Sequence, residues 1–248
     1  MKSRLIAQVV VIVPLIAFVS VAFAQTADNT EHKERLSKHY RLEKPKGAGP
    51  FPAVMMVPGC SGFEYASAKE AYNSGQKRLV ELGFVTLRVD YLAARNVSHC
   101  FDGGVSTEEV AIDIGIAAGY LREQTFVKKD SLNVVGWSYG GAGALQALGR
   151  TNHREPVKVD AVVAIYPLCD CVRQRWDSQV PVLVLVGLLD TAAPLKNCTG
   201  LFRGLPDERL TIKTYEDAQH EFDDFESPAY NKAAAESAFK ELVSFLHK

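Results

Sequence analysis

The chain has 248 residues, and its 28 basic and 29 acidic side chains leave a formal net charge of −1. No basic stripe of the kind that binds nucleic acid accompanies this balance, so the expected partner is a small molecule. The length and the hydrophobic share of 47% are enough for one domain with its own core.

Residues 1–24 have the pattern of a cleavable export signal. Lys2 and Arg4 precede an apolar run that ends in the triplet A-F-A at 22–24. The run is almost long enough to span a bilayer, so a retained membrane anchor is the alternative. The small residues of the triplet and the polar residues that follow favour cleavage. We therefore expect residues 25–248 to form a secreted or periplasmic domain without stable membrane insertion.

Beyond a loose polar lead-in at 25–35, short apolar runs alternate with longer segments of helical period. Strands are expected at 39–43, 53–57, 84–89, 132–136, 159–166, 180–187 and 210–215. Helices are expected at 67–82, 107–124, 139–148, 194–203 and 230–246. This alternation predicts an α/β fold with a mostly parallel central sheet and helices on both faces. In such sheets the functional site lies beyond the carboxyl ends of the strands.

The residues around Ser138 match the G-x-S-x-G pattern of a nucleophile elbow. The letters GWSYG at 136–140 lie between an expected strand and an expected helix, which is the context that the pattern requires. Small residues permit a tight turn that places the hydroxyl at a helix N-terminus. The alternatives are a glycine-rich turn with an N-capping serine and a dinucleotide-binding loop, whose glycine spacing the chain does not match.

A serine nucleophile needs a base, and the base needs a third group that holds it in place. On this kind of fold the chain order is serine, acid, histidine. Asp190 follows the strand at 180–187 and His220 follows the last strand, so both lie at carboxyl ends beside Ser138. The other five histidines precede the serine, lie in a polar turn or end the chain. Asp217 is the alternative acid, but it follows the wrong strand.

Two backbone groups are candidate donors to the oxyanion of an acyl-transfer reaction. The N–H of Tyr139 directly follows the serine. The N–H of Cys60 lies in the loop after the strand at 53–57, where Gly62 allows a close approach. A plain turn is the alternative for this loop.

Further charged residues lie near the expected site. Arg95 is in a loop that could reach it and bind a substrate carboxylate, although exposed arginine is usually solvated surface. Glu221, Asp223 and Asp224 are interpreted as a solvated acidic turn.

Five cysteines in an exported chain indicate disulfides, and their odd number leaves at least one unpaired. Cys169-Asp170-Cys171 lacks the CxxC or histidine spacing of a metal site, so disulfides are the preferred interpretation. No metal and no cofactor are expected.

With these residues in place, the chain resembles the dienelactone hydrolase family of α/β-hydrolases. The shared segments are PGCSG, GWSYGG, YPLC, GLLDTAAP and AQHEF, and they extend over essentially the whole chain after the export signal. The resemblance implies an α/β-hydrolase fold and a catalytic triad of Ser138, Asp190 and His220. It also implies oxyanion donors at the backbone of Cys60 and Tyr139.

Two departures modify what the resemblance implies. The best-known members have a cysteine nucleophile where this chain has Ser138, and a glutamate in the oxyanion loop where it has Gly59. Serine-type exported relatives are better described as esterases than as hydrolases of dienelactone itself.

The resemblance also suggests how the cysteines pair. It implies the disulfides Cys60–Cys100 and Cys169–Cys198. Cys171 is then left over, or competes for Cys198.

The sequence thus predicts an exported serine hydrolase that cleaves a small carboxylic ester or lactone through an acyl-enzyme. A peptidase or amidase with the same triad is the alternative among enzymes. A non-catalytic binding protein on the hydrolase fold is the alternative of another class, and a missing triad member would favour it.

Overall fold

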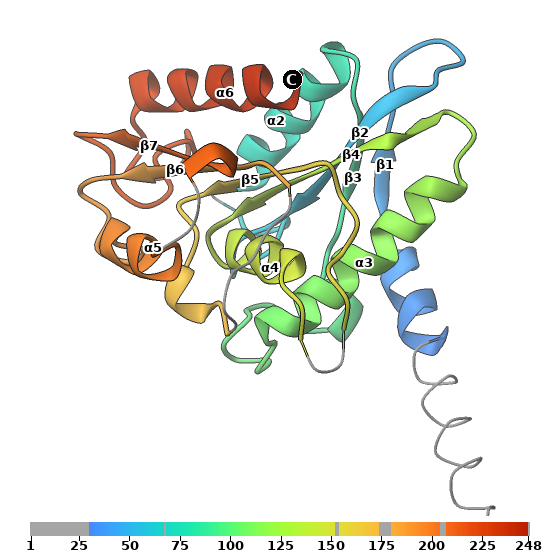
Figure 1. The fold of residues 1–248 in the computed structure, drawn as a ribbon, viewed down its shortest axis with the longest axis horizontal. Helices are drawn as coiled ribbons and strands as arrows, with labels where there is room; N and C mark the ends of the chain where they lie inside the picture. The colour runs from blue at the N-terminus through green and yellow to red at the C-terminus, as the bar shows by residue number, and fades with distance from the viewer. Residues whose placement is uncertain (1–29, 67, 152–153, 174–179, 204–206, 248) are drawn as a thin grey trace, which may run out of the picture.

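The computed structural model describes residues 30–66, 68–151, 154–173, 180–203 and 207–247. The expected export signal at 1–24 lies outside these residues. They form a seven-stranded sheet in the order β1-β3-β2-β4-β5-β6-β7 (Figure 1). Only β1 is antiparallel to its neighbour, and the other pairs are parallel. The expected mostly parallel sheet is therefore confirmed. The strands are β1 (Arg41–Glu43), β2 (Phe51–Val57), β3 (Val85–Arg88), β4 (Val127–Trp137), β5 (Ala161–Ile165), β6 (Val182–Gly187) and β7 (Leu210–Tyr215).

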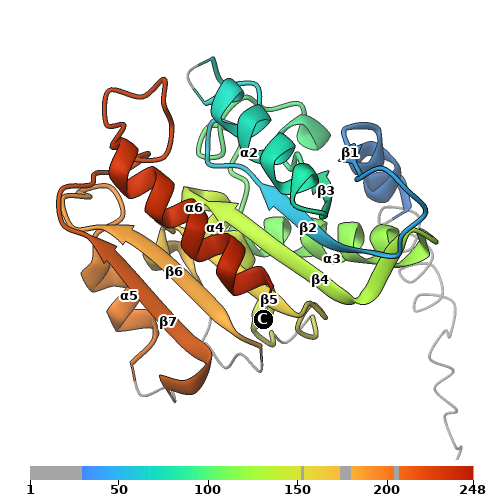
Figure 2. The ribbon, with the colours of Figure 1, turned by 90° about the horizontal axis from the view of Figure 1, so that it is seen from above.

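Helices cover both faces of the sheet, as the alternation of elements predicts (Figures 1 and 2). The helices α3, α4 and α5 pack on one face, and α2 and α6 pack on the other. Their bounds are α2 (Lys69–Glu81), α3 (Thr107–Glu123), α4 (Ser138–Leu148), α5 (Leu195–Leu201) and α6 (Lys232–Leu246). Three short 3₁₀ turns lie between these elements: η1 (Ala93–Arg95), η2 (Cys169–Cys171) and η3 (Asp207–Arg209).

The core consists of two apolar layers separated by the sheet. Along β5, Val162 and Ala164 join the layer under α3 and α4, whereas Val163 and Ile165 join the layer under α6. Side chains that alternate between two covered faces explain why the central strands are apolar at nearly every position. Each buried valine or isoleucine contributes about 1.5–3 kcal/mol relative to an exposed one.

The structure differs from the sequence-based expectation at the start of the domain. Residues 30–38 are helical rather than a loose lead-in. Leu36 is fully buried in the layer under α3, and His32 Nε2 lies 2.6 Å from Asp113 Oδ1 of α3. These contacts dock the polar segment on the domain. No helix in the described part of the chain has the length and apolar character needed to cross a membrane.

Candidate active site

Ser138 lies at the junction of β4 and α4 in a strained conformation. Its φ of 49° falls in the left-handed region that side chains other than glycine rarely adopt. A Cβ on Gly136 would come within 2.5 Å of the carbonyl oxygen of Gly140, and a Cβ on Gly140 would strike the carbonyl oxygens of Val57 and Pro58. Only glycine fits at either position. The two glycines thus permit the turn that lifts the serine out of the sheet.

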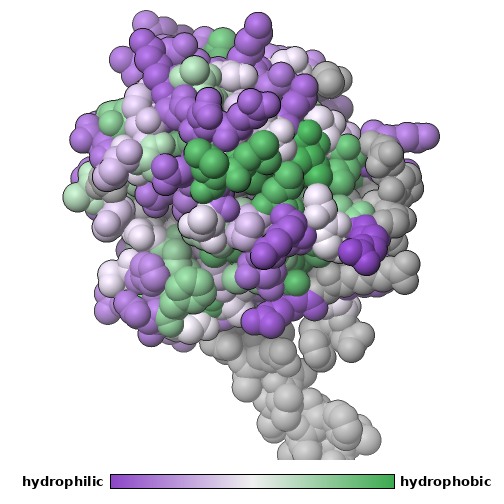
Figure 3. Space-filling view, turned by 90° about the vertical axis from the view of Figure 1, so that its left-hand side faces the viewer, coloured by the Kyte–Doolittle hydropathy of each residue, from purple (hydrophilic) through white to green (hydrophobic). Residues whose placement is uncertain are grey.

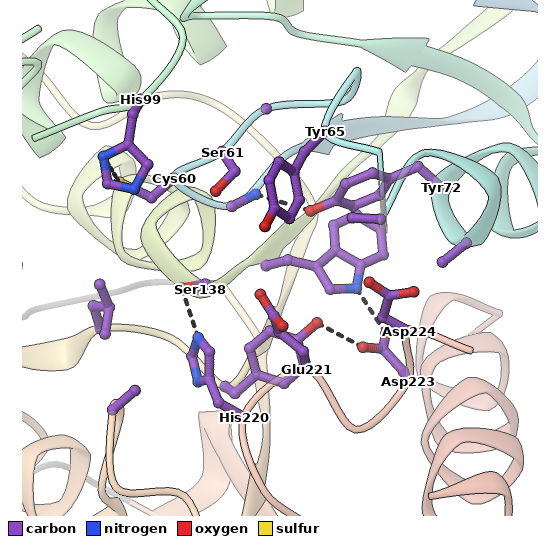
Figure 4. Close-up of a pocket in the computed structure, with 18 of the residues that line it drawn as sticks. Cys60, Ser61, Tyr65, Tyr72, His99, Ser138, His220, Glu221, Asp223 and Asp224 are labelled. Carbon is purple, nitrogen blue, oxygen red and sulfur yellow. Dashed lines mark hydrogen bonds between the residues drawn. The ribbon is translucent and has the colours of Figure 1, made fainter. Parts of the chain in front are cut away.

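His220 connects Ser138 to Asp190. Its Nε2 lies 2.9 Å from Ser138 Oγ (Figure 4), and its Nδ1 lies 2.7 Å from Asp190 Oδ2. Asp190 is 4% exposed, and its Oδ1 accepts hydrogen bonds from the backbone N–H groups of Ala192 and Ala193. The other carboxylate oxygen is therefore left to hold the imidazole. The structure brings together the three residues that the sequence suggests, and it orients them in the order acid, base, serine.

Backbone contacts between two loops bring the acid and the histidine together. The N–H of Leu189, after β6, donates to the carbonyl of Ala218, after β7, at 3.0 Å. Gly187 packs so closely on the Ala218 carbonyl that a Cβ there would overlap it. Asp190 directly follows Leu189, and His220 lies two residues after Ala218. The pairing register of β6 and β7 therefore determines the distance between Asp190 and His220.

The loop after β2 passes directly beside the serine. A Cβ on Gly59 would lie 3.5 Å from Ser138 Cβ, and the Gly59 N–H donates to the Tyr72 hydroxyl at 3.0 Å. Cys60 follows and lines the same pocket as Ser138. Tyr139 is the second residue of α4, and it is anchored because its hydroxyl donates to the Val105 carbonyl.

The cysteines pair as the family resemblance implies. Cys60 is bonded to Cys100, and Cys169 is bonded to Cys198. Cys171 keeps a free thiol at the edge of the pocket, and burial raises the pKa of that thiol.

Arg95 does not take the role suggested from the sequence. It is absent from the pocket wall, and its guanidinium forms ion pairs with the fully buried Asp113 at 2.5 Å and with Glu109 at 3.5 Å. Both partners belong to α3, and they hold the Arg95 side chain against that helix. Asp217, the alternative acid, is exposed, whereas Asp190 makes the contact with His220.

The expectation of a solvated acidic turn is wrong for two of its three acids, because Asp224 is buried and Asp223 is half-buried. Asp223 accepts hydrogen bonds from Trp137 Nε1 at 2.8 Å and from the Tyr166 hydroxyl at 2.6 Å. Asp224 is only 4% exposed. Burial raises the pKa of both carboxyl groups. Glu221 alone is exposed.

Ser138 and His220 line a pocket of about 430 Å³. Figure 4 shows His99 and Cys60 on one side of the serine, and Glu221, Asp223 and Asp224 together on the other, with Tyr65 and Tyr72 above them. Figure 3 faces the side of the molecule on which α5 and β7 lie in Figure 1, and a band of apolar surface crosses it. The loops that follow the strands supply exposed large apolar residues: Tyr65, Phe101, Leu188, Leu189, Phe225 and Tyr230.

A mostly parallel sheet with a serine at a strained strand–helix turn, and a histidine and an acid at the next strand ends, defines an α/β-hydrolase. The model of the dienelactone hydrolase family matches residues 39–248. The chain therefore belongs to the dienelactone hydrolase family, and it is a hydrolase of ester bonds.

Individual relatives are distant. A protein of Bradyrhizobium sp. named as a probable 2-oxo-3-(5-oxofuran-2-ylidene)propanoate lactonase is 24% identical over 227 residues, which cover 83% of this chain and 87% of the relative. A crystal structure of a putative dienelactone hydrolase from Klebsiella pneumoniae superposes with a TM-score of 0.70 at 18% identity, covering 84% of this chain and 92% of that one. An esterase from Thermogutta terrifontis, with propionate bound, gives 0.64 at 15% identity and covers 84% and 88%.

Proposed function

We propose that this protein is an exported serine hydrolase that cleaves a small carboxylic ester or lactone with Ser138, His220 and Asp190. The observation that carries the proposal is the continuous hydrogen-bond chain from Ser138 Oγ through His220 to Asp190, with distances of 2.9 and 2.7 Å. Both distances fall within the range required of a nucleophile and its base.

In the proposed reaction each of the three side chains has one role. Ser138 Oγ attacks the ester carbonyl carbon while His220 Nε2 takes the hydroxyl proton. The imidazolium then returns that proton to the alkoxide leaving group, which gives an acyl-enzyme and an alcohol. Water, deprotonated by the same nitrogen, releases the acid and regenerates the serine. Asp190 keeps the proton of the imidazole on Nδ1 throughout and stabilises the imidazolium.

Two backbone N–H groups would stabilise the tetrahedral intermediate. The N–H of Tyr139 lies in the first turn of α4, where the helix dipole favours negative charge. The N–H of Cys60 lies in the loop that packs on Ser138. Removing one such donor in other acyl-transfer enzymes costs about 10²–10³-fold in kcat. Because both donors are backbone groups, the loop conformation determines their effect.

Export is supported by two independent features. Cys60–Cys100 and Cys169–Cys198 are disulfides, which persist in oxidising compartments. The sequence of residues 1–24 fits a cleavable signal.

Labelling with a fluorophosphonate tests the proposed nucleophile. The wild type should be labelled at one site, and Ser138→Ala should lose the label, whereas Ser131→Ala, within the N-terminal half of β4, should keep it. Absence of label on the folded wild type would favour a non-catalytic binding protein.

Matched nitrophenyl esters and nitroanilides then distinguish an esterase from an amidase. We expect hydrolysis of short-chain esters, with kcat reduced about 10⁴-fold in Asp190→Asn because the imidazole loses its correct tautomer. Faster cleavage of the anilides than of the esters would instead support a peptidase or amidase.

A further inference from the structure

The described side chains that line the pocket beside Ser138 carry more acidic than basic groups. Its described lining contains four carboxylic side chains and no lysine or arginine: Asp170, Glu221, Asp223 and Asp224 supply the carboxyl groups. Arg95, the candidate partner for a substrate carboxylate, is held by Asp113 outside the pocket. A negatively charged substrate would therefore meet like charges close to the serine, which costs free energy in a partly desolvated site.

Asp224 is the most informative of these residues because its carboxylate is buried without a full set of partners. Only 4% of the residue is exposed. Its Oδ1 accepts a hydrogen bond from the backbone N–H of Glu226 at 3.0 Å, but Oδ2 has no partner among the described residues. A buried carboxylate oxygen without a donor is costly, and folded proteins keep few such atoms. A positively charged ligand in the pocket, which Asp224 lines, would compensate the charge of this carboxylate.

The neighbouring Asp223 is held as an acceptor. The indole N–H of Trp137 can only donate, and it points at Asp223 Oδ2 at 2.8 Å, while the Tyr166 hydroxyl donates to Oδ1 at 2.6 Å. These two rings also line the pocket. The carboxylate thereby stays at the wall beside two aromatic side chains.

Aromatic rings surround the same side of the pocket. Tyr65 is half exposed above Glu221 and the two aspartates (Figure 4), and two further rings of the pocket wall, Tyr72 and Trp137, pack edge to face at 5.2 Å. Aromatic faces together with carboxylates are the combination that binds alkylated ammonium groups, through cation–π attraction and charge. The ring surface also accepts the methyl groups of such a cation.

We propose that this pocket selects ester substrates that carry an ammonium or alkylammonium group, with Glu221 and Asp224 as specificity determinants and the rings of Tyr65 and Trp137 as the surrounding wall. The inference rests on the proposed function, because the cation must lie on a molecule whose ester reaches Ser138. It separates this chain from the Bradyrhizobium relative, whose name specifies a propanoate, an anion.

A pair of isosteric esters tests the preference. Acetylcholine and 3,3-dimethylbutyl acetate differ only in the positive charge, and 4-acetoxybutanoate places a negative charge at a similar distance. We expect wild-type kcat/KM to be roughly tenfold higher for acetylcholine than for the neutral ester, and lowest for the anionic ester. A tenfold preference is what one partly desolvated cation–π contact would give. The ratio should fall severalfold in Asp224→Asn and in Glu221→Gln. Asp130→Asn changes an exposed acid in the N-terminal half of β4, outside the pocket wall, and should leave the ratio unchanged.

Binding to the inactive Ser138→Ala variant provides a readout that does not depend on turnover. Phenyltrimethylammonium should bind this variant in calorimetry, and severalfold more weakly when Asp224→Asn or Glu221→Gln is added. Hydrolysis of the neutral ester without any advantage for acetylcholine would overturn the inference and leave the proposed function intact. Failure to hydrolyse any ester, with phenyltrimethylammonium still bound, would overturn the proposed function and keep the cation site. No binding of the cation would overturn the inference.

Discussion

Asp190 and Asp224 are both 4% exposed, but their carboxylates have very different surroundings. Asp190 accepts two backbone hydrogen bonds on one oxygen and the His220 contact on the other. Asp224 accepts one backbone bond and leaves one buried oxygen without a partner. The first arrangement stabilises a carboxylate at a fixed position. The second is a source of instability in the unliganded protein, and this difference can be measured.

Asp224→Asn should stabilise the folded protein at neutral pH. Burial raises the pKa of Asp224, and Glu221 and Asp223 add to the effect, so the charged carboxylate is less favourable in the folded than in the unfolded chain. A raised pKa means that the folded state binds the proton more tightly, and wild-type stability therefore rises as pH falls through that pKa. Thermal unfolding should give Asp224→Asn the higher Tm at pH 7 and a narrowing difference on acidification. A lower Tm for the variant at pH 7 would contradict this account.

The sequence predicted the positions of some residues of the site but not the surroundings of others. The chain order and the strand ends identified Ser138, Asp190 and His220, because a motif and a topology each constrain them. The surroundings of charged residues have no such local signature. Arg95 was misjudged because its partner Asp113 lies on α3, 18 residues further along the chain, and no short-range pattern shows that pairing.

The acidic turn was misread for a related reason. Glu221, Asp223 and Asp224 look solvated as a run of charges, but Phe222 between them is fully buried and pulls the turn into the core. The hydrogen-bond partners of Asp223 are Trp137, the last residue of β4, and Tyr166, the first residue after β5.

The helix α4 contacts the end of β2 so closely at Gly140 that no side chain fits there. Gly140→Ala would put a methyl group onto the backbone oxygens of Val57 and Pro58. Backbone cannot yield as a flexible side chain does, so we expect a loss of about 3 kcal/mol or more in unfolding free energy. A displacement of α4 also moves Ser138, and about 1 Å of misplacement can cost 10²-fold in rate.

Gly119→Ala is the matched control for this prediction. Gly119 is an exposed position of α3 where a Cβ meets no atom within 4 Å. Alanine there should stabilise the protein by about 0.5–1 kcal/mol through helix propensity. Urea unfolding and ester turnover are to be measured for both variants. Equal changes in unfolding free energy and turnover for Gly140→Ala and Gly119→Ala would refute the close-contact argument.

The two disulfides connect different pairs of elements, so their removal should have different consequences. Cys60–Cys100 joins the loop beside Ser138 to the loop after β3, with a separation of 40 residues, and Cys169–Cys198 joins η2 to α5 with a separation of 29. By chain entropy each contributes up to about 4 kcal/mol to stability. Only the first holds the backbone N–H that we propose as an oxyanion donor.

We therefore expect Cys60→Ala/Cys100→Ala to lower both stability and kcat, the latter by about tenfold or more. Cys169→Ala/Cys198→Ala should lower stability by a similar amount with a smaller effect on kcat. Steady-state kinetics below the unfolding temperature of both variants separate the effects. Full kcat in the first variant would exclude a role of this disulfide in the reaction.

Most elements were predictable because the alternation of apolar runs and helical segments follows from the two-layer burial of a parallel sheet. The exception is the helix at 30–38. Its sequence is polar, and its docking depends on two long-range contacts of Leu36 and His32 that no local periodicity reveals.

Across the whole molecule, Asp113 joins three segments that lie far apart in the sequence. Its carboxylate is fully buried, with Oδ1 2.6 Å from His32 Nε2 of the N-terminal helix and Oδ2 2.5 Å from Arg95 Nη1 of η1. Asp113 itself belongs to α3. The Arg95 side chain is 17% exposed, so a lost partner would leave its charge poorly solvated.

Asp113→Asn should accordingly destabilise the protein by about 3 kcal/mol, the lower end of the cost of breaking a buried ion pair, because Glu109 stays within 3.5 Å of Arg95. Glu155→Gln is the control, because its pair with Arg150 at 2.6 Å is 70% and 71% exposed and should contribute less than about 1 kcal/mol. Adding Arg95→Met to Asp113→Asn should restore part of the loss, since the unpaired charge is then gone.

Urea unfolding of the three variants measures these differences, and ester turnover should stay at the wild-type level in all of them because neither Asp113 nor Arg95 lines the pocket. A loss in Asp113→Asn no larger than in Glu155→Gln would mean that the cluster does not hold the N-terminal helix. In that case the burial of Leu36 would have to supply the docking energy, and Leu36→Ala, at about 2–4 kcal/mol, would become the more damaging change.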